Sequence, residues 1–226
     1  MLRPLRIIFR IAEKDLRIEF RNRQAFLTVL FFAFLILVIF KFAFDPGEET
    51  VGGAISGILW VALLFPGVIQ LNRSFQQEME EGTLFGLLLA PVDRSWIFLG
   101  KFAANSVFLL AVDGLILLAF LALYNITARI ELLWLAPLVA LAGIAFCAVG
   151  TLFAAMVSTI RTRDVLLPIL LFPILVPVIL AAVNATREIL EPVEAGFFAN
   201  WVQLLAACCV IFTAGAFVAF EYVVGE

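Results

Sequence analysis

The sequence predicts an all-α polytopic membrane protein with six transmembrane helices. Apolar residues make up 64% of the 226-residue chain and charged residues only 15%, whereas soluble domains have roughly 45–50% and about 25%. The mean hydropathy is +1.12. Almost all charged residues fall in short gaps between apolar runs, and each run reaches the ~20 residues that a bilayer span needs. The runs are residues 24–44, 50–71, 102–124, 132–159, 165–185 and 196–220.

Two polar segments lie outside these runs, residues 1–23 and the loop 72–101. We expect residues 1–23 to form a separate cytoplasmic segment and residues 24–226 to form one membrane domain. Six spans and their connections use most of the chain, so no room is expected for a soluble domain. A catalytic or energy-coupling module is therefore expected on another chain.

The residue types that carry most enzyme chemistry are missing or scattered. The sequence has no histidine, which is the commonest general base and a frequent ligand of haem iron. It contains no phosphate-binding G-x-x-x-x-G-K-[ST] loop and no H-E-x-x-H motif. Cys147, Cys208 and Cys209 lie inside predicted spans and are expected to be packing residues. We expect no catalytic, cofactor or metal site, which disfavours a membrane enzyme and favours a transporter, a channel or an assembly subunit.

Basic residues are sorted between alternate connections. Twelve of the fifteen Lys and Arg residues fall in the N-terminal segment, the loop 72–101 and the connection that holds Arg161 and Arg163. The other connections hold only Lys41, Arg129 and Arg187. Because basic residues in short loops remain cytoplasmic, both termini are expected in the cytoplasm.

The N-terminal segment has the pattern of an amphipathic helix. Its basic residues recur in steps of three or four, at positions 3, 6, 10, 14, 17 and 21. Most of its apolar residues fall on the opposite face. We favour a helix that lies in the membrane interface with its arginines toward lipid phosphates, over a segment that serves only as a topology signal. Nucleic-acid binding is not expected, because the basic stripe is short and tied to a span.

The loop 72–101 contains an acidic cluster followed by a short apolar run, residues 84–90, that cannot span and that Pro91 ends. One interpretation is a re-entry of the chain into the interface before span three. The other is a coupling helix that docks in a groove on a cytoplasmic ATPase. The candidate coupling residues are Glu78, Glu80, Glu81, Gly82, Thr83, Leu84, Leu87, Leu88 and Pro91.

Two features inside the spans are unusual. Asp113 is the one acidic residue well inside a predicted span, where an ionisable group is costly and usually faces the bundle interior. It is expected either to hydrogen-bond a neighbouring helix, for instance through Asn105, Ser106 or Thr151, or to line a substrate route or proton site. Span five contains Pro168, Pro173 and Pro177, which predict a distorted helix beside a cavity.

Several segments together resemble the haem exporter protein B (CcmB) family, the permease subunit of the cytochrome c maturation ABC transporter. They are KDLRIEFRNR (14–23), GILW (57–60), FQQEMEEGTLFGLLLAP (75–91), Gly100–Lys101 and the proline stretch 168–177. The similarity runs from about Lys14 into span five.

The resemblance implies an ABC-2-type permease-like fold in the bacterial cytoplasmic (inner) membrane, with two copies pairing with two copies of a cytoplasmic ATPase. It also implies haem-handling membrane partners and an external haem chaperone. ATP would be bound by the ATPase, and haem is a possible cargo. The family role has two descriptions, export of haem and ATP-driven release of the haem-loaded chaperone. The alternatives are an ABC-2-type exporter of a drug, lipid or glycan, and an assembly scaffold that moves no substrate.

Overall fold

The computed structural model describes residues 2–44, 51–80, 93–126, 130–158, 160, 162–191 and 196–223. These residues form α-helices and one short 3₁₀ helix, and they include no strand. In chain order the elements are α1 (Leu2–Arg21), α2 (Arg23–Ala43), α3 (Val51–Glu80), α5 (Arg94–Leu123), η1 (Ile130–Trp134), α6 (Leu135–Val157), α7 (Arg163–Leu190) and α8 (Phe198–Val223).

The prediction of six spans is confirmed. Within the described residues, six helices are long and apolar enough to cross a membrane. Each predicted run corresponds to one of them, in the same order. The all-helical fold class follows from the same observation.

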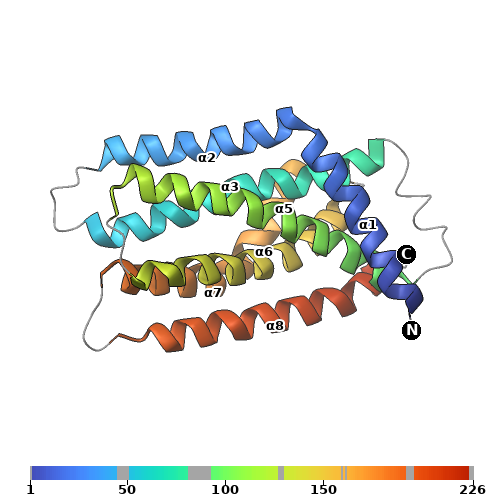
Figure 1. The fold of residues 1–226 in the computed structure, drawn as a ribbon. Coiled ribbons are helices and arrows are strands. Elements are labelled where there is room, and N and C mark those ends of the chain that lie inside the picture. The colour runs from blue at the N-terminus through green and yellow to red at the C-terminus, as the bar shows by residue number, and fades with distance from the viewer. Residues whose placement is uncertain are drawn as a thin grey trace.

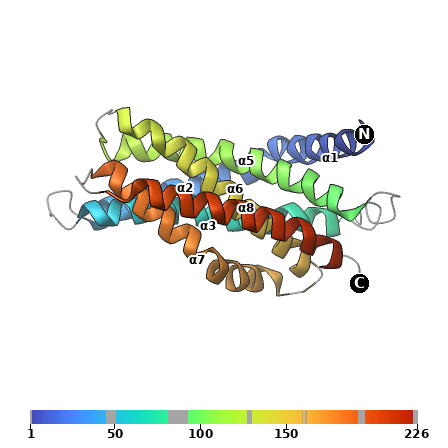
Figure 2. The ribbon, with the colours of Figure 1, turned by 90° about the horizontal axis from the view of Figure 1, so that it is seen from below.

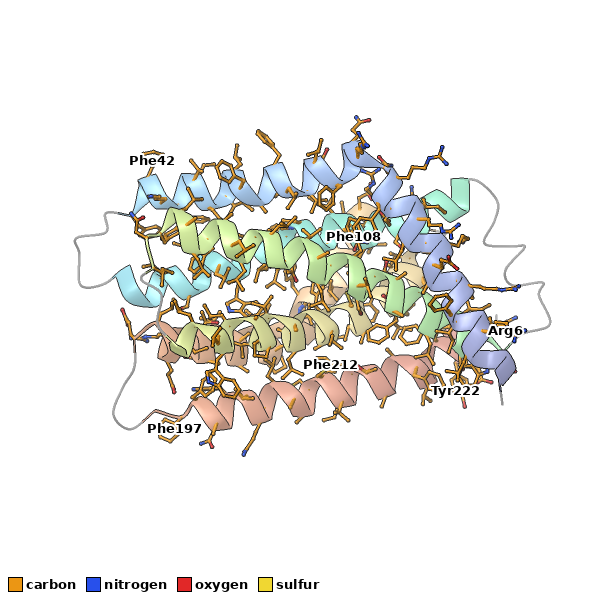
Figure 3. The ribbon with its side chains drawn as sticks, viewed as in Figure 1. Arg6, Phe42, Phe108, Phe197, Phe212 and Tyr222 are labelled. Atoms are coloured by element: carbon orange, nitrogen blue, oxygen red, sulfur yellow. The ribbon has the colours of Figure 1, made fainter. Side chains whose placement is uncertain are left out.

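The six long helices run back and forth along one direction, and α1 crosses one end of the bundle obliquely (Figure 1). We call this the α1 end. The end of α3, the start of α5 and the end of α8 also lie there (Figure 1). The beginning of α1 and the end of α8 therefore share one side, as six crossings require. Arg6 and Tyr222 lie at the α1 end, whereas Phe42 and Phe197 lie at the opposite end (Figure 3).

The core is formed where α3, α5, α6 and α7 meet. Leu59, Phe108, Phe146 and Leu171 are among its fully buried side chains, one from each of these helices. Helix α2 flanks the core through α3 and α5, and α8 flanks it through α6 and α7. These outer helices expose many large apolar side chains, as surfaces in contact with membrane do.

Side-chain bonds close the opposite end of the bundle. The Lys41 ammonium donates to the carbonyl of Leu123, and the Tyr124 hydroxyl donates to the carbonyl of Leu37 at 3.1 Å. Both bonds join α2 to the end of α5. Glu188 on α7 accepts bonds at 3.1 Å from the Trp201 indole and from the backbone N–H of residue 197, which hold the start of α8.

Helix α7 stays continuous through Pro168, Pro173 and Pro177 but changes direction along its length (Figure 2). Proline removes a backbone donor and clashes with the preceding turn, which accounts for the bend. The prolines lie away from the buried face of α7, which is made by Leu167, Leu171, Leu175 and Val178. The expected distortion of this span is therefore present.

The connection between spans two and three is shorter than the sequence predicts. Helix α3 continues to Glu80, because no proline or glycine interrupts residues 72–80, and α5 begins at Arg94. Glu78 and Glu80 thus belong to the last turn of α3. The other candidate coupling residues lie outside the described residues, namely Glu81, Gly82, Thr83, Leu84, Leu87, Leu88 and Pro91.

Candidate functional sites at the α1 end and in the core

Helix α1 has three faces, and the predicted amphipathic helix is confirmed. The basic face is exposed and carries Arg6, Arg10, Arg17 and Arg21. A second, apolar face exposes Leu5, Phe9 and Phe20. Between them lies a narrow buried face formed by Ile11, Asp15 and Glu19, which are spaced four residues apart and are each 8% exposed.

The buried face of α1 packs on the first turns of α5, the helix with which α1 makes its most extensive contact. Gly100 permits this close approach. A β-carbon at position 100 would lie 2.8 Å from Cβ and Cγ2 of Ile11 and 3.3 Å from the backbone oxygen of Ile8. Any larger residue would therefore push α1 away from α5.

Next to this contact lies a buried ion pair. Lys101, which is 1% exposed, places its ammonium 3.3 Å from Oδ2 of Asp15. The half-exposed Lys14 ammonium lies 3.0 Å from the other oxygen, Oδ1. Two cations thus hold one carboxylate. Buried ion pairs contribute little net stability, but removing one partner leaves an uncompensated buried charge.

Glu19 lies one turn further along the same face. Burial raises the pKa of its carboxyl; the Arg73 guanidinium opposes this, and Asp15 adds to the rise. Arg73 belongs to the last part of α3 and Lys101 to the first part of α5. The two carboxyl groups on the buried face of α1 therefore interact with charged residues of both helices that border residues 81–92.

An aromatic cluster fixes the other end of α1. The ring of Phe20 lies 5.4 Å from that of Phe108 on α5 and 6.5 Å from that of Phe26 on α2. Phe26 and Phe108 meet edge to face at 6.0 Å. Phe108 is fully buried and belongs to the core, so this cluster ties the α1–α2 junction to the core.

The apolar face of α1 borders an open groove of about 720 Å³ shared with α5. Leu5, Phe9, Leu16 and Phe20 line it from α1, and Val107 lines it from α5. An apolar surface beside a row of arginines is what an interfacial helix presents to a lipid bilayer.

The charge cluster was missing from the sequence interpretation. In the sequence alone, Lys101 indicates orientation and, like Asp15 and Glu19, belongs to a segment that carries the family resemblance, but nothing predicts a contact between these residues. A signal was present, since Ile11, Asp15 and Glu19 recur every four residues within a basic segment. Together these contacts fix α1 against the first part of α5, with Glu19 within electrostatic reach of Arg73 on α3.

Asp113 lies in the core, midway along α5. It is 3% exposed, so the expectation that it faces protein rather than lipid is confirmed. The expected bonds to neighbouring polar residues are not what the structure shows. Asn105 donates to Thr151 at 3.1 Å, while Oδ1 of Asp113 has no hydrogen-bond partner in the described part of the chain.

Asp113 borders a cavity of about 10 Å³ that residues of α3, α5, α6 and α7 enclose. Val178 and Ile179, which follow Pro177, are among its lining residues, so the proline-containing helix does border a cavity. Trp60 lines it too, but its indole N–H already donates to Thr186 at 2.9 Å. The space is far too small for a porphyrin.

The three cysteines behave as the sequence suggested. Cys147, Cys208 and Cys209 are free thiols buried among apolar side chains. They fill space in α6 and α8.

Known proteins place this chain in one family. A family model described as "CcmB protein" matches residues 6–222. The chain belongs to the CcmB family. It is 27% identical over 177 residues to heme exporter protein B of Haemophilus influenzae, covering 78% of this chain and 79% of that protein. The heme exporter protein B of Pseudomonas aeruginosa is 24% identical over 210 residues, covering 88% and 89%. With its six apolar helices, the chain is a multi-pass protein of the bacterial inner membrane.

The structure brings together two of the segments on which the resemblance to the CcmB family rests. KDLRIEFRNR, residues 14–23, supplies Asp15 and Glu19. The Gly100–Lys101 pair supplies the close helix contact and the buried ammonium. A third segment, GILW, supplies Trp60 beside Asp113. Most of the fourth segment, residues 75–91, lies outside the described residues.

Proposed function

We propose that this chain is the membrane-spanning permease subunit of an ABC transporter for cytochrome c maturation. In this role it couples ATP hydrolysis by a partner ATPase to haem export or to release of a haem-loaded chaperone. The match to the CcmB family over residues 6–222 carries the proposal. Relatives named heme exporter protein B, aligned over more than three quarters of their length, support it.

The α1 end is proposed to be the cytoplasmic end. Twelve of fifteen basic residues belong to the connections on that side. Both termini are then cytoplasmic, and α1 lies in the inner interface with its exposed arginines near lipid phosphates. Externally added thiol reagent is expected to label a cysteine placed at Glu48 or Glu191. Labelling from the cytoplasm alone would reverse the orientation.

Residues 81–92 are proposed to meet the ATPase. They connect α3 to α5, and α1 packs on the first turns of α5 and pairs with Lys101 there. Motion of the ATPase at this connection would therefore act on α5 and, through the Asp15–Lys101 pair, on α1. In this proposal the apolar run 84–90, with Leu84, Leu87 and Leu88, makes the contact. Glu78, Glu80, Glu81, Gly82 and Thr83 precede it in the sequence, and Pro91 ends it.

The chain is proposed to bind neither nucleotide nor haem iron strongly by itself. It has no phosphate-binding loop and no histidine. ATP then belongs to the partner ATPase, and a haem-ligating group belongs to another subunit or to the external chaperone. The assembly is proposed to contain two copies of this chain and two of the ATPase.

A gene deletion tests the proposal. The host without this chain is expected to lose mature c-type cytochromes and to regain them with the intact gene. Leu87→Asp is expected to abolish rescue and to detach the ATPase on purification, because a charge buried without a counter-ion costs several kcal/mol. The matched control, Leu87→Met, keeps both. Normal levels of c-type cytochromes in the deletion strain would contradict the proposal and would favour an exporter of another substrate.

A further inference from the structure

The carboxyl of Asp113 combines near-complete burial, a place within a membrane-spanning helix and an oxygen without a described partner. It is 3% exposed in the middle of a membrane-spanning helix. Its Oδ1 is buried and accepts no hydrogen bond from the described residues. Buried polar atoms almost always have a partner, so the unpaired oxygen calls for a ligand that side chains do not supply.

Among the described side chains, no cation faces this carboxyl from the helices around it. On α3, α5, α6 and α7, the charged side chains that the structure describes lie toward the helix ends. Lys101 is the nearest on α5, about 18 Å away along the axis at 1.5 Å per residue, and it pairs with Asp15. These charged residues are Arg73, Arg94, Lys101, Arg163, Asp164, Arg187 and Glu188.

One other ionisable group interacts with Asp113. It is the buried thiol of Cys147 on α6. A neutral thiol offers no positive charge. An ionised carboxylate at this place would therefore be desolvated and uncompensated, a combination that favours the neutral acid.

The cavity beside Asp113 has the size for one small occupant. Its volume is about 10 Å³, close to the roughly 10–15 Å³ that admits a single water molecule. The other lining side chains are apolar or aromatic, and the polar edge of Trp60 is already bonded to Thr186. A water needs two or more polar partners, and Asp113, which lines the cavity, has two carboxyl oxygens.

We propose that Asp113 forms a proton-binding site in the core of the bundle, where its neutral carboxyl holds one water molecule in the adjoining cavity. The acid O–H donates to the water, and the water donates back to the carbonyl oxygen of the same carboxyl. This closed pair of bonds gives the unpartnered oxygen its missing donor. The site takes a proton and one water and has no room for haem.

Gly143 gives the proposal a built-in control. A β-carbon at this position of α6 would lie 3.4 Å from Oδ2 of Asp113, which is ordinary contact. Gly143 also lines the cavity. Gly143→Ala therefore fills the place of the water and leaves the carboxyl itself unchanged.

Infrared spectroscopy of the purified complex in lipid nanodiscs tests the site directly. The difference between wild type and Asp113→Asn is expected to contain the carbonyl band of one protonated carboxylic acid at neutral pH. Gly143→Ala is expected to keep this band and to shift it to higher frequency, because the acid loses its hydrogen-bonding partner. Asp113→Glu, which keeps an acid at the site, covers the case in which the asparagine variant does not assemble.

Two results would overturn the proposal. Loss of carboxylate bands, rather than an acid band, in Asp113→Asn would show that the group is ionised. An acid band that Gly143→Ala leaves unmoved would show that no water is bound. Neither reading depends on transport activity, so the test stands or falls separately from the proposed function.

Discussion

Two buried carboxyl groups of this protein, Asp15 and Asp113, have similar burial and opposite surroundings. Asp15 is 8% exposed and lies between the ammonium groups of Lys101 and Lys14. Asp113 is 3% exposed and has an oxygen without any partner in the described residues. The first site is at the α1 end, and the second is deep in the membrane core. The two sites show that burial alone does not determine how a carboxyl group interacts with its surroundings. The charges next to it matter as much.

The same substitution at both aspartates should give the largest contrast. Asp15→Asn removes the carboxylate charge that lies 3.3 Å from the buried Lys101 ammonium, and is expected to lower the free energy of unfolding by about 3–5 kcal/mol. Asp113→Asn replaces a neutral acid by a neutral amide, and is expected to change it by less than about 1 kcal/mol, the net worth of an ordinary hydrogen bond. Denaturant unfolding in mild detergent, followed by helical circular dichroism, measures both.

A double variant checks that the cost comes from breaking the buried ion pair between Asp15 and Lys101. Asp15→Leu combined with Lys101→Met removes both charges, and should be more stable than Asp15→Asn alone, because apolar replacements of buried ion pairs are often neutral. Equal losses in the two aspartate variants would mean that Asp113 is also ionised and paired.

The glycine beside each site offers a second, smaller contrast. Gly100→Ala places a methyl group 2.8 Å from Ile11, whereas Gly143→Ala places one 3.4 Å from Asp113. We expect Gly100→Ala to cost about 1–3 kcal/mol, as overpacked sites do, and to loosen α1. Faster proteolysis within α1, with Gly143→Ala as the control, would report this. Equal cleavage of the two variants would remove the close contact from the account.

Glu19 is a third buried carboxyl group, and its substitution is expected to change stability least. Burial raises its pKa in the folded protein, so the folded state binds the proton more tightly than the unfolded state. Stability from this group is full below the ordinary glutamate value of 4.5 and is lost as pH rises through the folded pKa. Glu19→Gln should remove this part of the pH dependence. Melting temperatures of both proteins across the acidic range test it, and parallel curves would show that Glu19 does not titrate abnormally.

Sequence reasoning succeeded where the signal is local. The six spans, the amphipathic α1 and the inward position of Asp113 depend on hydropathy and periodicity, which a single sequence contains. It failed where the signal is a contact between distant residues. Lys101 and Asp15 lie 86 positions apart in the sequence, and nothing in either segment alone announces the pairing.

In the core, too, the sequence does not predict which distant residues meet. Asn105, Ser106 and Thr151 were the expected neighbours of Asp113, but Asn105 bonds Thr151 instead. Helix rotation decides which polar groups meet, and a difference of one residue turns a side chain by 100° around the axis. The predicted loop 72–101 is also partly helical, because residues 72–80 are polar but contain no helix breaker and continue α3.

Site-specific photocrosslinking in native membranes tests the central claim that residues 81–92 couple this permease to an ATPase. A photoreactive amino acid is placed at Leu87, and for comparison at Glu48 in the connection on the opposite side. The account predicts a crosslink from position 87 to a cytoplasmic ATPase subunit and none from position 48. Crosslinks from position 87 to lipid alone, or an ATPase crosslink from position 48, would contradict it.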